Sequence, residues 1–77
     1  MESKVLVPEL GEGIAKATVS FWYLKEGDQV KFDDDIVELV TDKATFNVSA
    51  TANGTLKKIF VKEGEDINIG GVLALIA

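Results

Sequence analysis

The chain contains an internal repeat. When the sequence is shifted by 37 residues, Thr18–Val40 aligns with Thr55–Ala77 without a gap. The two segments share the motif Lys-Glu-Gly, at residues 25–27 and 62–64, and apolar residues occupy matching positions in both. A unit that recurs in this way buries its apolar face against its neighbour. We therefore expect two similar four-stranded halves, related by an approximate two-fold axis.

Short runs of β-branched and aromatic residues with a period near two indicate strands, and no segment has the period of a long helix. Clusters of glycine and acidic residues separate these runs and are typical of turns. Their spacing favours an all-β sandwich or barrel. The expected strands are Ser3–Val7, Ala17–Leu24, Gln29–Val30, Ile36–Val40, Thr45–Ser49, Gly54–Val61 and Val72–Ile76.

The composition limits the chemistry of the chain. It has no histidine and no cysteine, which excludes a Ser-His-Asp or Cys-His site and a disulfide. A net charge of −5, with lysine as the only basic residue type, argues against nucleic-acid binding. No apolar run approaches the ~20 residues that cross a membrane, and no signal-peptide block begins the chain. We expect one non-catalytic, monomeric domain over residues 1–77, without a metal site.

Lys43 lies at the tip of a predicted hairpin. With Asp42 and Lys43 as the central turn residues, the apolar side chains of the flanking strands share one face. A shift of the turn by one residue would break this pairing of apolar side chains, because successive side chains alternate between faces. Asp-Lys is not an Asn-Gly type of pair, so we expect a type I turn and not type I′. The apolar face comprises Val37, Leu39, Phe46 and Val48.

The position of Lys43 suits covalent modification. Its ε-amine stands on a flexible stem, and an amide formed there would attach a long arm to a rigid support. The turn follows the first repeat, and the equivalent point of the second repeat lies just past Ala77. We therefore expect the Lys43 turn and the chain termini at opposite ends of the domain.

Several motifs resemble the lipoyl domain of the acyltransferase component of 2-oxo acid dehydrogenase complexes. They span essentially the whole chain in the family's order: residues 7–14 (VPELGEGI), 25–28 (KEGD), Val30 and 41–45 (TDKAT). The resemblance implies a flattened barrel of two four-stranded antiparallel sheets. It also implies lipoate in amide linkage on Lys43, in a turn formed with Asp42 and Ala44. The chain then resembles a domain excised from the N-terminus of a longer acyltransferase.

The same resemblance implies a function and partners. The lipoyl group would receive an acyl group from a thiamine-dependent 2-oxo acid decarboxylase and pass it to coenzyme A at the acyltransferase site. Dihydrolipoamide dehydrogenase would reoxidise it, and a lipoate ligase or lipoyl transferase would attach it. In the family, the loop that corresponds to Gly11, Glu12 and Gly13 helps the decarboxylase recognise the domain. Glu12 favours a pyruvate or branched-chain complex, so an acetyltransferase is the expected parent. The expected location is the cytoplasm in bacteria and the mitochondrial matrix in eukaryotes.

Two positions depart from the family pattern. Asp33-Asp34 stands where the family often has Gly-Asp, so this turn lacks its glycine and is expected to be strained or differently shaped. Phe32 replaces a residue that is frequently polar. Its repeat partner is Ile69, and we therefore expect Phe32 in the core.

Two alternatives to a lipoyl carrier stay open. Biotin carriers share the fold and the lysine turn, but their lysine is usually flanked by methionines, whereas Met1 is the only methionine here. An unmodified β-interaction module is the other alternative. It would carry no adduct and would tolerate Lys43→Gln.

Overall fold

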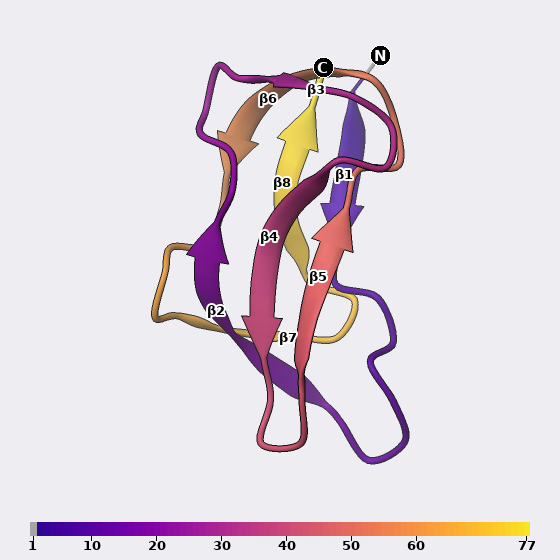
Figure 1. The fold of residues 1–77 in the computed structure, drawn as a ribbon, viewed down its shortest axis with the longest axis vertical. Coiled ribbons are helices and arrows are strands. Elements are labelled where there is room, and N and C mark those ends of the chain that lie inside the picture. The colour runs from indigo at the N-terminus through magenta and orange to yellow at the C-terminus, as the bar shows by residue number, and fades with distance from the viewer. Residues whose placement is uncertain (1) are drawn as a thin grey trace.

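The computed structural model describes residues 2–77, which form eight strands and no helix. The strands are β1 Ser3–Leu6, β2 Lys16–Trp22, β3 Gln29–Val30, β4 Asp35–Val40, β5 Thr45–Ser49, β6 Gly54–Ile59, β7 Asp66–Asn68 and β8 Val72–Ile76. They make two four-stranded antiparallel sheets, ordered β1-β8-β6-β3 and β5-β4-β2-β7. The sheets face each other in a flattened barrel (Figure 1). The expected all-β architecture is confirmed. Within residues 2–77, no helix could span a membrane.

Backbone hydrogen bonds between the halves follow the repeat. The amide of Gly27 donates to the carbonyl of Leu56 at 2.7 Å, and the equivalent amide of Gly64 donates to Val19 at 2.7 Å. The two glycines have φ of 95° and 91°, a conformation that glycine adopts without strain. Each turn is thus bonded to a strand of the other half. The predicted two-fold relation is present in the contacts.

The N-terminal strand completes the second half. Ala50, which follows β5, exchanges backbone hydrogen bonds with the turn at residues 33–34. Val7, which follows β1, makes the same exchange with the turn at residues 70–71. Strand β1 therefore holds the place in the second half that β5 holds in the first. Figure 1 shows both termini at one end of the barrel and the β4–β5 turn at the other, as the repeat predicts.

The space between the sheets is filled by apolar side chains. The buried residues among 2–77 are all hydrophobic, and none is polar or charged. Core positions recur in the repeat: Ile36 and its partner Leu73 are both fully buried, as are Leu39 and, at 1% exposure, its partner Ile76. Burial of one such side chain contributes about 1.5–3 kcal/mol. The matched apolar positions in the sequence are therefore the core.

The strand assignments differ from the expected ones by more than one residue at three places. Strand β7, Asp66–Asn68, was not expected, although the repeat pairs its first two residues with Gln29–Val30. Strands β2 and β6 end at Trp22 and Ile59, each two residues before the expected end. Strand ends are the least constrained part of such a pattern, because apolar residues continue past the last ladder pair.

The expectation that Phe32 lies in the core is wrong, since its side chain is 66% exposed. Its repeat partner Ile69 does pack against the core. The two turns are anchored differently. The amide of Ile69 donates to the backbone carbonyl of Ala15, whereas the amide of Phe32 donates to the side-chain Oδ1 of Asn53. The repeat is therefore not symmetric at this turn.

Asp33 carries the backbone strain expected at its turn. It is the one non-glycine residue among 2–77 with a positive φ, 75°, and its repeat partner Gly70 has φ of 84°. A side chain in this left-handed region crowds the backbone, and aspartate tolerates it better than most residues.

Asp33→Gly is expected to raise the free energy of unfolding by up to about 1 kcal/mol, because it removes this strain. The matched control is Gly70→Ala, which should lower it by about 1 kcal/mol. Since no atom lies within 4 Å of a Cβ built on Gly70, that loss is conformational. Urea unfolding measures both changes. An Asp33→Gly variant that is less stable than the parent would show that Asp33 does not strain the backbone.

Two glutamates also link the halves. Glu26 Oε2 accepts a hydrogen bond from the amide of Ile59 at 2.8 Å, and Glu63 Oε2 accepts one from Trp22 at 3.1 Å. Glu26 and Glu63 are repeat partners, as are Trp22 and Ile59. The Lys-Glu-Gly motif therefore supplies, in each half, an acceptor for an amide at the end of a strand in the other.

Alanine at Glu26 or Glu63 removes one of these bonds and is expected to lower the free energy of unfolding by about 1 kcal/mol at these exposed sites. The two contacts share no residue, so the double variant should lose about the sum. Glutamine keeps an acceptor oxygen and is the matched control. Thermal or urea unfolding measures the free energy of unfolding of each variant. Alanine variants as stable as the parent would show that these hydrogen bonds do not contribute to stability.

Candidate functional site

The β4–β5 hairpin has the register expected from the sequence. Val40 pairs with Thr45, and further along the strands Leu39 pairs with Phe46. The amide of Thr41 donates to the carbonyl of Ala44 at 2.8 Å and closes the turn. The central turn residues are therefore Asp42 and Lys43, as predicted.

The hydroxyl of Thr41 organises this turn. Its Oγ1 donates to the carbonyl of Ala44 at 2.9 Å and accepts from the amides of Lys43 and Ala44 at 3.2 and 3.0 Å. One hydroxyl thus uses its donor and both lone pairs on the turn backbone. Neither Asp42 nor Lys43 has a positive φ, so the turn is not type I′. The tip is held by local bonds and leaves its side chains free.

Lys43 projects from the far end of the domain. Asp42, Lys43 and Ala44 are all exposed. In the part of the chain that the structure describes, the ion pairs are Lys16–Asp66 and Lys57–Glu2, so the Lys43 ammonium has no carboxylate partner there. An exposed and unpaired primary amine is accessible to an enzyme that forms an amide.

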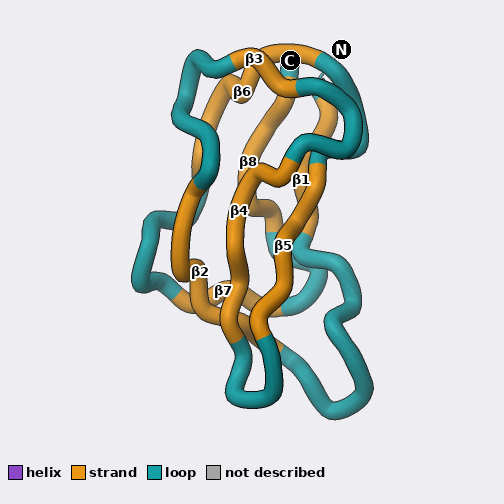
Figure 2. The backbone as a smooth tube through the Cα atoms, in the orientation of Figure 1, coloured by secondary structure: helices purple, strands orange, loops and turns teal. Residues whose placement is uncertain are grey.

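The loop of Gly11, Glu12 and Gly13 lies beside the lysine turn, as the resemblance implies. A Cβ built on Gly13 would lie 3.6 Å from Lys43 Nζ. Gly13 has φ of 81°, which favours glycine at this contact. Figure 2 shows the β1–β2 loop and the β4–β5 turn together at one end of the barrel. A shallow groove runs between them, lined by residues 13–18 and 40–42.

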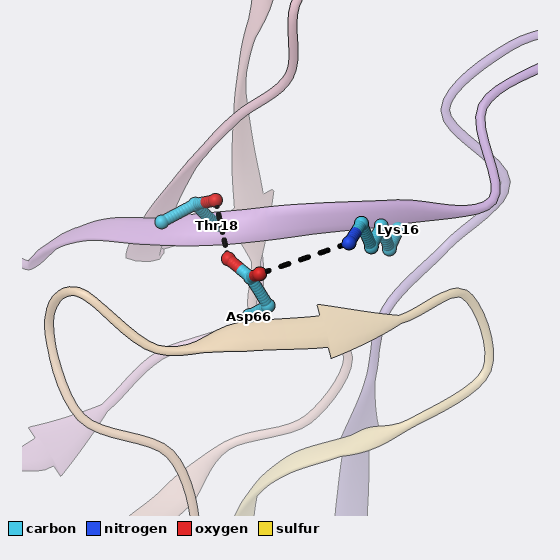
Figure 3. A network of polar contacts seen from close by, with 3 residues as sticks. All are labelled: Lys16, Thr18 and Asp66. Carbon is cyan, nitrogen blue, oxygen red and sulfur yellow. Dashed lines mark hydrogen bonds and ion pairs between the residues drawn. The ribbon is translucent and has the colours of Figure 1, made fainter.

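The β2 end of this loop is fixed by polar contacts to β7. Thr18 Oγ1 donates to Asp66 Oδ1 at 2.6 Å, and Lys16 Nζ lies 3.9 Å from Asp66 Oδ2 (Figure 3). In the adjoining ladder, Lys16 pairs with Asn68 and Thr18 with Asp66. The loop beside Lys43 therefore starts and ends on paired strands. These contacts were not predicted, because β7 itself was not.

The side chains at this site fit a carboxylic acid cofactor joined through an amide. The one nucleophile at the turn tip is the Lys43 amine, and lipoate and biotin both attach to lysine through their carboxyl groups. Within residues 2–77, no group of three or more acidic residues is arranged to hold a metal ion. The turn offers one primary amine to which such a group could be joined.

Comparison with known proteins identifies the class. The family model described as "Biotin-requiring enzyme" (biotin/lipoyl) matches residues 3–76, and the chain belongs to this biotinyl/lipoyl family. The urea carboxylase of Kluyveromyces lactis contains the same fold, with a TM-score of 0.85 at 21% identity, over 100% of this chain and 6% of that one. The fold is therefore that of the biotinyl/lipoyl family.

Within the family, the chain is a lipoyl domain, a class that carries lipoate on a lysine. It is similar to the lipoyl domain of the 2-oxoglutarate dehydrogenase complex of Azotobacter vinelandii, with 35% identity and a TM-score of 0.77, over 96% of this chain and 94% of that one. Succinyltransferase components of 2-oxoglutarate dehydrogenase complexes are similar too. The component from Rickettsia conorii is 46% identical over 91% of this chain, and that from Bartonella vinsonii subsp. berkhoffii is 38% identical over 99%.

The chain spans 18% of the length of each of these two relatives. The relatives do not confirm the expected acetyltransferase, because they are succinyltransferase components. The expectation rested on Glu12 alone, and one residue of an exposed loop does not define which acyl group a distant active site transfers.

Thr41→Val is expected to loosen the turn by about 1 kcal/mol, because it removes three hydrogen bonds and keeps the shape of the side chain. Amide hydrogen exchange at Lys43 and Ala44 should become faster, while the exchange of core amides changes little. Thr45→Val, at the adjacent exposed strand position, is the matched control. Unchanged exchange at Lys43 in Thr41→Val would show that the hydroxyl does not hold the turn.

Proposed function

We propose that Lys43 is the attachment site of lipoate and that the domain presents this group to the enzymes of a 2-oxo acid dehydrogenase complex. The observation that carries the proposal is the exposed, unpaired Lys43 amine at the tip of a hairpin. When bound, lipoate supplies a dithiolane that accepts acyl groups and electrons. The cofactor performs the chemistry, and the protein supplies position and recognition.

The turn residues set the position and direction of the Lys43 side chain. Thr41 fixes the backbone on either side of Lys43, so the stem of the lysine starts from a defined point and direction. Beyond that point the methylenes rotate freely, which gives the cargo a high local concentration at nearby active sites. Asp42 and Ala44 flank the lysine and are exposed with it, so an attaching enzyme meets all three together.

The complex that we propose is the one that oxidises 2-oxoglutarate, with a succinyltransferase as the parent chain. The similarity to succinyltransferase components and to the lipoyl domain of a 2-oxoglutarate dehydrogenase complex supports this proposal. The proposed partners are its thiamine-dependent decarboxylase, dihydrolipoamide dehydrogenase and a lipoate ligase or lipoyl transferase. The loop of Gly11, Glu12 and Gly13 is the proposed contact for the decarboxylase, because it lies beside Lys43.

Lys43→Gln is expected to abolish lipoylation, because glutamine has no amine to form the amide. Incubation with a lipoate ligase, ATP and lipoate, followed by intact mass spectrometry, measures the adduct. Lys25→Gln and Lys62→Gln are matched controls, since both remove an exposed lysine from a turn. Both should be lipoylated like the parent. A parallel incubation with a biotin ligase should leave the parent unlabelled.

Three results would contradict this assignment. A lipoyl adduct on Lys43→Gln would place the site elsewhere. A parent chain that stays unmodified, while the ligase labels a known lipoyl domain, would favour an unmodified interaction module. Labelling by the biotin ligase alone would favour a biotin carrier.

The lipoylated domain is expected to be acylated at least about tenfold faster by a 2-oxoglutarate decarboxylase with 2-oxoglutarate than by a pyruvate decarboxylase with pyruvate, since partner contacts and not the cofactor discriminate. Mass spectrometry resolves succinyl and acetyl adducts. The unlipoylated domain is the control and should gain neither group. Faster acetylation would restore the acetyltransferase that the sequence first suggested.

A further inference from the structure

Asn53 and Gly54 form an Asn-Gly pair at the start of β6. Asn53 is exposed and lies outside the strand, and Gly54 is the first residue of β6. The β5–β6 connection lies at the end of the barrel that carries the termini, away from the β4–β5 turn (Figure 1). The pair is therefore remote from the carrier lysine and plays no part in the function proposed above.

Both residues of this pair make contacts that hold this connection in place. A Cβ built on Gly54 would lie 2.5 Å from the carbonyl oxygen of Ala77 and 2.8 Å from Ile76 Cγ2, so no larger residue fits without a shift of backbone. Asn53 Oδ1 accepts a hydrogen bond from the amide of Phe32 at 2.6 Å and ties two connections together. The sequence at this point is thus constrained by packing and hydrogen bonding.

We propose that Asn53 is a site of spontaneous deamidation, with the backbone nitrogen of Gly54 as the nucleophile. Gly54 has no side chain to shield that nitrogen. The Phe32 amide bonded to Asn53 Oδ1 polarises the side-chain carbonyl and favours attack at Cγ, as a donor does in an oxyanion hole. Gly54 pairs with Val30 at the end of a two-residue ladder, and such an end opens readily.

The chemistry needs only water. A bond forms between the Gly54 nitrogen and Asn53 Cγ, the bond from Cγ to Nδ2 breaks, and ammonia leaves with the proton of the Gly54 amide. Water then adds to one of the two carbonyls of the five-membered imide. Opening on one side gives aspartate at position 53, and opening on the other gives isoaspartate, in which the main chain runs through the side-chain carbon. No oxidation or reduction occurs.

The two products should differ in their effect on the fold. Aspartate keeps an oxygen that can accept the Phe32 hydrogen bond. Isoaspartate adds one carbon to the main chain directly before β6, where Thr55 and Ala77 exchange hydrogen bonds of 2.8 and 2.9 Å. Their register depends on the length of this chain, so isoaspartate should weaken the pairing. Lys43, at the other end, should still accept lipoate.

The test is incubation of the folded domain at mildly alkaline pH, followed by peptide mapping with mass spectrometry and enzymatic detection of isoaspartate. Asn47 and Asn68 are internal controls, because Val48 and Ile69 follow them and β-branched residues hinder the attacking nitrogen. We expect Asn53 to lose its amide roughly tenfold or more faster than either control, and faster as pH rises. Asn53→Gln should suppress the reaction, since its ring would be larger.

The same incubation in denaturant decides whether the fold permits the reaction. Conversion of Asn53 in the unfolded chain but not in the folded domain would overturn the proposal, because the β6 ladder would then protect the pair. Two further measurements test the consequence. Asn53→Asp should unfold like the parent in urea, whereas the purified isoaspartate form should unfold at lower urea. An isoaspartate form as stable as the parent would refute the predicted effect on β6.

Discussion

The hydrogen bonds exchanged between the two halves are the constraint on which the rest of this structure depends. A chain of 77 residues with no cysteine has a small core and no covalent cross-link. In this fold the Gly27 turn is bonded to Leu56 of the other half, and the Gly64 turn to Val19. The glutamates of the same turns bond to amides at the ends of β2 and β6. Because each half supplies hydrogen-bond partners to the other, each half stabilises the other.

The two-fold relation between the halves also places the Lys43 turn and the chain termini at opposite ends of the molecule. Strand β1 takes in the second half the position that β5 takes in the first, as the matching bonds of Val7 and Ala50 show. The first half therefore has a closed hairpin where the second has a break in the chain. The hairpin carries Lys43, and the break provides the termini (Figure 1). In a carrier of the kind proposed above, this arrangement keeps the lysine away from the chain ends.

Much of this fold could be predicted because the relevant signals are local or repeated. Alternation of apolar and polar residues set the register from Val40–Thr45 along the hairpin, and the structure has that register. The repeat predicted the opposite placement of turn and termini. Two features of the fold were missed. Strand β7 was not expected, although the repeat pairs its first two residues with Gln29–Val30. Phe32 was expected in the core because of its repeat partner, but it is exposed, and its turn is held by a contact to Asn53, 21 residues away, that the sequence did not show. The hydrogen-bond partners of Glu26 and Glu63 could not be predicted either, since each partner lies in the other half.

The hydrogen bonding also distinguishes the Lys43 turn from the turns that carry other exposed lysines. Exposure does not distinguish Lys43, because Lys25 and Lys62 are also exposed and lie in turns. Those two turns, however, are bonded across the interface between the halves, and their backbones pack against a neighbouring strand. The bonds of the Lys43 turn all stay within its own hairpin, and the β4–β5 turn extends beyond the strands at its end of the barrel (Figure 1). Under the proposal that Lys43 carries lipoate, this difference in turn geometry, and not the reactivity of the amine, is what would let an attaching enzyme distinguish Lys43 from Lys25 and Lys62.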